Sequence, residues 1–169
     1  EQEEEIDRLS LAALLLRDGH YDRAAAVLAE VDLSAEGQDL ALGQSFDWPR
    51  YHMLVGLTAL KSGRYKDATT ALERSIQAGQ TDPMAQVFLA QARFGTQDLA
   101  GTIQALDAAG QAAYKLAGTF LIKAQCHWRL GQRVSAWIAL TEGLARHPQV
   151  RQMARHRVLL LVDMGLFLQ

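Results

Sequence analysis

The chain has 169 residues, of which 49% are hydrophobic, and its formal net charge at pH 7 is −2. This length allows one domain with a sizeable apolar interior, and a sequence rich in Ala and Leu with few breakers is typical of an ordered helical protein. The small net charge gives no support for a nucleic-acid surface, which normally requires a basic face. A lone cysteine, Cys126, excludes an internal disulfide framework and a multi-cysteine metal site.

The first pair of expected helices follows an acidic start, Glu1 to Glu5. Negative charge is favourable there because the helix dipole is positive at its N-terminus. Apolar residues then follow a helical spacing that ends at Gly19, and a second helix is expected from Tyr21 to about Val31. Residues 32–48 form an insertion with an expected extra turn of helix packed back on the array, and it either carries binding or is a longer connection with a little helix.

Helical spacing continues in three further pairs and a final helix. The expected ranges are 49–62 with 66–78, 83–95 with 98–110, 117–130 with 133–146, and about 150–164. Residues 110–116 are expected to connect the third pair to the fourth. Pro83 and Pro148 stand at junctions where a helix has to stop.

A short turn sequence recurs between the two helices of a pair. Gly63 is followed by Tyr65 and small Ala68. Glycine returns at Gly131, two steps of 34 residues later, and at Gly165, one further step later, which indicates a period of about 34 residues. A glycine just past a helix can take the left-handed conformation, and a small residue one turn later lets two helices approach closely. In the third pair the glycine has moved to Gly95, which predicts that the preceding helix ends slightly early.

This pattern resembles the tetratricopeptide repeat family. Matching small residues in the first helices are Ala12, Gly56, Ala90 and Ala124, and matching large ones in the second helices are Leu28, Leu72, Leu106 and Leu140. The resemblance implies an all-α fold, a right-handed α-solenoid of stacked antiparallel helix hairpins. It further implies a single array over 1–169, with repeats at about 5–38, 49–82, 83–116 and 117–150 and a partial repeat at 151–169. The departures are Arg93, Lys123 and His127, which occupy slots that are usually large and apolar.

No catalytic or metal-binding constellation is visible in the sequence. The five histidines lack metal-binding spacing, and Cys126 and His127 point about 100° apart because they are adjacent in a helix. We therefore expect no enzymatic activity, no metal and no cofactor. The longest late apolar run, Val158–Val162, is too short to cross a bilayer. We expect a soluble segment, either cytoplasmic or periplasmic. It could be part of a larger protein, including one that is attached to a membrane.

A partner-binding groove is implied by the resemblance, because the first helices of this family face an extended peptide or partner segment. The residues expected to contact a partner here are Arg50, Met53, Leu57, Met84, Gln91, Phe94, Gln125, Trp128 and Arg155. For Leu57, packing between neighbouring units is an equally good interpretation. The family's two-carboxylate clamp is not supported, because its slots hold Ala13, Leu57, Gln91 and Gln125.

The expected function is a non-catalytic protein-interaction scaffold that binds a peptide or helix in the groove. The alternatives are a structural spacer or assembly subunit of a bacterial envelope export or secretion apparatus, and an accessory helical domain of a larger enzyme. The final helix is apolar most of the way round at Val158–Val162 and needs a covering partner. This feature predicts self-association through the C-terminal end.

Overall fold

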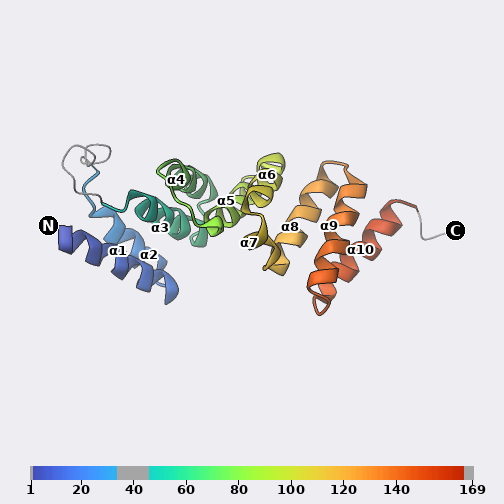
Figure 1. Ribbon diagram of the computed structural model, residues 1–169, viewed down its shortest axis with the longest axis horizontal. Helices are drawn as coiled ribbons and strands as arrows, with labels where there is room; N and C mark the ends of the chain where they lie inside the picture. The colour runs from blue at the N-terminus through green and yellow to red at the C-terminus, as the bar shows by residue number, and fades with distance from the viewer. Residues whose placement is uncertain (1, 34–45, 166–169) are drawn as a thin grey trace.

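The computed structural model describes residues 2–33 and 46–165, and within these ranges the regular structure is helical and contains no strand. The helices follow one another along one long axis, with the two termini at opposite ends (Figure 1). Their bounds are α1 Gln2–Arg17, α2 Tyr21–Ala29, α3 Trp48–Lys61, α4 Tyr65–Gln77, α5 Pro83–Gly95, α6 Leu99–Ala109, α7 Gln111–Tyr114, α8 Ala117–Arg129, α9 Arg133–Arg146 and α10 Arg151–Asp163. Most of the expected insertion, residues 34–45, lies outside the described residues.

The helices pack as hairpins that stack on one another. α1 pairs with α2, α3 with α4, α5 with α6, and α8 with α9, while α10 packs on α9. Consecutive hairpins are joined by contacts of α4 with α5 and of α6 with α8. The first helices of the hairpins, α1, α3, α5 and α8, also contact each other in turn. The predicted all-α solenoid, with its tetratricopeptide-like architecture, is thereby confirmed.

Three of the helices begin at an aspartate cap. The carboxylates of Asp47, Asp82 and Asp98 accept hydrogen bonds from the first-turn backbone N–H groups of α3, α5 and α6, at 3.0, 2.9 and 2.9 Å. Such caps satisfy donors that have no partner within the helix. From α3 onward the helix bounds agree closely with the prediction, except that the 110–116 connection contains the short helix α7, which was not predicted.

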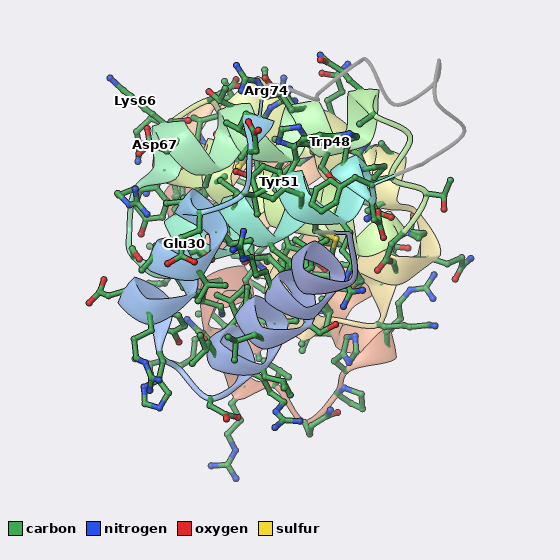
Figure 2. The ribbon with its side chains drawn as sticks, turned by 90° about the vertical axis from the view of Figure 1, so that its left-hand side faces the viewer. Glu30, Trp48, Tyr51, Lys66, Asp67 and Arg74 are labelled. Atoms are coloured by element: carbon green, nitrogen blue, oxygen red, sulfur yellow. The ribbon has the colours of Figure 1, made fainter. Side chains whose placement is uncertain are left out.

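The core is divided into clusters along the row. One cluster joins α1, α2 and α3 around Leu9 and Leu28, and its Tyr51 ring lies beside that of Trp48 at a centroid distance of 5.8 Å (Figure 2). Others centre on Leu72 in the middle hairpins and on Leu140 near the C-terminal end. Each hairpin therefore buries its apolar side mainly against its neighbours, as in other repeat proteins.

The polar departures from the repeat pattern are accommodated by pairing. The Arg93 guanidinium donates to Glu73 Oε1 of the preceding hairpin at 2.8 Å and to the Gly101 carbonyl at 3.1 Å. Lys123 Nζ lies 2.5 Å from Asp107 Oδ1, and His127 Nδ1 lies 2.6 Å from the amide oxygen of Gln132. These side chains bridge neighbouring elements through polar contacts where the family usually has an apolar contact.

The prediction that α5 ends early is wrong. α5 ends at Gly95, in the same register as the last residues of α3 and α8, Lys61 and Arg129. Gln97 itself adopts the left-handed conformation, with φ of 66°, where Gly63 has 74° in the second hairpin. The turn geometry is therefore retained without a glycine at that position.

Candidate partner-binding face

The candidate site is one face of the first helices of the hairpins. Successive residues in an α-helix are rotated by about 100°, so Arg50, Met53, Leu57 and Lys61 lie along one side of α3. The corresponding side of the following helices carries Met84, Gln91 and Phe94 on α5, Gln125, Trp128 and Arg129 on α8, and Arg155 on α10. We call these residues the first-helix face. It is continuous from α3 to α8, because α3 contacts α5 and α5 contacts α8.

The first-helix face combines exposed charges with half-buried apolar and amide side chains. Arg50 and Arg155 are exposed, and the other predicted contact residues, from Met53 to Trp128, are all half-buried. None of the nine predicted residues is fully buried. A partner could therefore still cover part of each side chain.

Several residues of the face already contact neighbouring units. Met53 Sδ accepts a hydrogen bond from Gln80 Nε2 at 3.3 Å, and the Arg129 guanidinium lies 5.3 Å from the centre of the Phe94 ring. Met84 and Trp128 pack against buried core clusters. These five side chains of the face have a structural role in packing, which sequence periodicity alone does not reveal.

Two side-chain amides on the face have no hydrogen-bond partner in neighbouring units. Gln91 on α5 and Gln125 on α8 stand at the same register of adjacent helices. Neither side chain forms a hydrogen bond to another residue within the described part of the chain. Each half-buried amide therefore retains its donor and acceptor capacity.

A buried thiol, Cys126, lies behind the face. Burial raises the pKa of the Cys126 thiol, and a hydrogen bond with Thr102 offsets only part of this effect. The thiol is therefore protonated at neutral pH, although the thiolate is the nucleophilic form. Within residues 2–33 and 46–165, no group of three His, Cys, Asp or Glu side chains is placed to hold a metal ion.

Comparison with solved structures places this geometry among known folds. MamA of AMB-1 superposes with a TM-score of 0.81 and 16% identity, covering 98% of this chain and 85% of that chain. The chain has the fold of MamA. MamA of MSR-1 gives a TM-score of 0.80 at 18% identity, over 96% of this chain and 88% of its own. MamA from Desulfovibrio magneticus RS-1, residue 41 to the end, gives 0.78 at 15%, over 96% and 86%.

The likeness to MamA concerns the fold, because the sequences are so far apart. No protein-family model and no curated protein matches the chain. None of the helices in the described ranges is long and apolar enough to span a bilayer.

A hollow that the sequence did not predict lies between α4, α5 and α6. It has a volume of about 480 Å³, and its lining includes Glu73, Gln86 and Arg93. Gln86 is in register with His52 and Phe120, whose rings are buried in the neighbouring hairpins. Replacement of a ring by a flexible amide at this register is the sequence signal that could have indicated the hollow.

Proposed function

We propose that the chain is a non-catalytic scaffold that binds a protein segment on its first-helix face. The observation that carries the proposal is the pair of amides Gln91 and Gln125, which have no hydrogen-bond partner among the described residues. A side-chain amide can donate to a backbone carbonyl and accept from a backbone N–H, so two amides on adjacent helices suit a peptide main chain.

Apolar neighbours of the amides would supply the affinity. Phe94 and Trp128 stand one helical turn beyond Gln91 and Gln125, and both are half-buried. Aromatic side chains that become fully covered are common hot spots, and truncation of one typically costs about 2 kcal/mol or more. A solenoid presents such residues along an extended surface, which fits an extended or helical partner segment. We also propose that residues 1–169 form one array with the repeat bounds expected from the sequence.

The proposal can be tested with peptides selected against the purified chain by display. The dissociation constant of a selected peptide is then measured for the parent and for the double variant Gln91→Ala, Gln125→Ala. We expect binding to weaken about tenfold or more, because a partner's buried polar groups would lose their hydrogen bonds. The matched control is Gln77→Ala, Gln104→Ala, which removes two exposed amides beside the hollow between α4, α5 and α6. Peptides that respond only to the control pair would overturn the proposal.

The spacer alternative is favoured by a separate observation at the C-terminal end. Four large apolar side chains of α9 and α10 are more than half exposed: Val134 by 66%, Ile138 by 57%, and Leu159 and Val162 by 56% each. Val134 and Ile138 stand one turn apart on α9, while Leu159 and Val162 continue the register of Gln125 and Trp128 onto α10. Exposed large apolar side chains of this kind mark an interaction surface. Under this alternative, changes at the end abolish association while changes at Gln91 and Gln125 have no effect.

A further inference from the structure

Charged residues are divided unequally along the row of first helices. α1 carries Glu3, Glu4, Glu5 and Asp7, whereas α3, α5, α8 and α10 carry a single acidic residue, Asp163, at the last position of α10. Their basic residues are Arg50, Lys61, Arg93, Lys123, Arg129, Arg151, Arg155 and Arg157. The chain as a whole has a net charge of −2, so this excess is a property of these helices and not of the overall composition.

Basic residues that point away from the first-helix face are already compensated. Arg93 and Lys123 lie on the opposite side of their helices and pair with Glu73 and Asp107, both from second helices. Arg157 also points away from the face, and its guanidinium lies 5.0 Å from the centre of the Trp137 ring. These contacts explain three of the basic residues as parts of the packing between hairpins.

Basic residues on the face itself have no such compensation. Arg50, Lys61, Arg129 and Arg155 are exposed, and none forms an ion pair with a carboxylate in the described part of the chain. Arg129 donates to Gln97 Oε1 at 2.8 Å and stacks on Phe94, which holds its charge beside the apolar residues of the face. The face therefore carries uncompensated positive charge at intervals along its length, with Met, Leu and Phe side chains in between.

We infer that the partner segment is acidic and amphipathic, with Asp or Glu side chains beside apolar ones. This inference rests on the proposed function and adds the chemistry of the partner. Carboxylates on the partner would pair with Arg50, Lys61, Arg129 and Arg155, while its apolar side chains would cover Met53 and its neighbours. Complementary charge of this kind sets specificity and association rate more than affinity. The phosphates of a nucleic acid could pair with the basic residues, but they would not cover the half-buried methionine and leucine side chains.

The first experiment compares three fluorescent probes by anisotropy with the purified chain. They are a helical peptide of Leu and Glu with Leu on one face, the same peptide with every Glu replaced by Lys, and oligothymidine of similar charge. We expect the acidic peptide to bind about tenfold or more tightly than the basic one, and its affinity to fall as salt is raised. Equal binding of the two peptides, tighter binding of oligothymidine, or no binding of the acidic peptide overturns the inference.

The second experiment reverses charges at matched positions. Arg50→Glu, Lys61→Glu, Arg155→Glu changes exposed residues of the face, and Arg23→Glu, Lys66→Glu, Arg74→Glu makes the same change in charge on α2 and α4. In Figure 2 the Lys66 side chain points outward from α4, and Arg74 lies at the upper edge of the molecule. We expect the face variant to lose about tenfold or more in affinity for the acidic peptide and the control to change about twofold or less.

Equal losses in the two charge variants would contradict the inference, because they would show an effect of net charge alone. Circular dichroism is the control that checks whether both variants are folded. A version of the probe with Gln in place of Glu separates this inference from the proposed function. If the Gln peptide binds as tightly as the Glu peptide and still depends on Gln91 and Gln125, the face binds peptides but not acidic ones. If the replacement of Gln91 and Gln125 by Ala changes the affinity of no peptide, the proposed function fails as well.

Discussion

The ring of Tyr65 lies against the backbone of Gly95, so closely that a Cβ atom at Gly95 would stand 2.3 Å from Tyr65 Cγ. Tyr65 is the first residue of α4 and Gly95 is the last residue of α5, so this contact joins consecutive hairpins near their turns. The glycine therefore serves a close approach between two hairpins. Its own turn is closed by Gln97, which has the left-handed φ of 66°.

Replacement of Gly95 by Ala is expected to destabilise the fold. The new methyl group would overlap the Tyr65 ring, which has to move, and overpacking of this kind costs about 1–3 kcal/mol. Gly118→Ala is the control, because no atom lies within 4 Å of a Cβ at that helical glycine. The control should be neutral or stabilising by up to about 1 kcal/mol, since Ala favours helix. Urea unfolding followed by circular dichroism measures both, and a similar loss in the two variants would rule out the steric explanation.

Gln97→Gly is expected to stabilise the chain relative to Gln97→Ala. Both changes remove the hydrogen bond between Gln97 and Arg129, but only glycine relieves the left-handed backbone. That conformation costs a residue with a Cβ about 1–2 kcal/mol, part of which glycine returns as backbone entropy. We expect a difference of about 1 kcal/mol between the two variants in thermal or urea unfolding. No difference would show that the backbone at this position is unstrained.

The two uses of glycine explain where the sequence prediction succeeded and where it failed. The repeat register was readable because Gly63 and Gly131 recur at a fixed interval with both turns left-handed. Gly95 broke the pattern for a reason outside its own hairpin, the Tyr65 ring. Such a contact between segments far apart in the sequence cannot be read from local spacing.

The candidate site shows the same limit. Helical spacing identified which residues share the first-helix face, but not which of them are already occupied in packing. Met53 contacts Gln80, in the loop after α4, and Phe94 stacks on Arg129 of α8, so in both cases the partner lies outside the helix of the face residue. The short helix α7 was missed because residues 111–114 are too few to show a period. The ion pairs that neutralise Arg93 and Lys123, like the hollow beside Gln86, depend on how the hairpins stack and cannot be predicted from helical spacing.

Arg93→Ala should destabilise the chain more than Arg93→Met. The Arg93 side chain is 20% exposed and bridges Glu73 and the Gly101 carbonyl. Alanine leaves a void and unpaired polar groups, with a typical cost of about 1–3 kcal/mol. Methionine also removes the ion pair, but Glu73 is 40% exposed and can be solvated by water, while the methionine side chain fills the space that alanine would leave empty. Equal unfolding free energies for the two variants would show that the volume of this side chain is unimportant.

Cys126 is expected to make the stability fall at alkaline pH. Burial raises the pKa of its thiol in the folded chain, so the unfolded chain releases the thiol proton first as pH rises. Its contribution is fully present below the unfolded pKa of about 8.5 and is lost as pH rises from there toward the folded pKa. Urea unfolding from about pH 7 to about pH 10 should therefore show a steeper decline for the parent than for Cys126→Ala. Parallel curves would mean that the folded thiol titrates normally.

The C-terminal end is expected to drive self-association of the isolated chain. Val158 stands in the register of Gly56, Ala90 and Ala124, which are buried in their hairpins, yet it is 46% exposed on α10. On α9, Val134 and Ile138 are exposed at the register where α4 has Lys66 and Thr70. Apolar residues have thus replaced polar ones on a surface that the other hairpins leave open to water.

Light scattering over a range of concentrations measures this association. The mass of the parent chain should rise with concentration, and the double variant Ile138→Lys, Val162→Lys should remain monomeric, because each lysine places a charge in the apolar contact. The matched control is Leu11→Lys, Leu14→Lys, which changes two exposed leucines of α1 at the other end of the solenoid. A parent chain that stays monomeric at high concentration contradicts the prediction. A control variant that dissociates as fully as the α9 and α10 variant contradicts an interface confined to the C-terminal end.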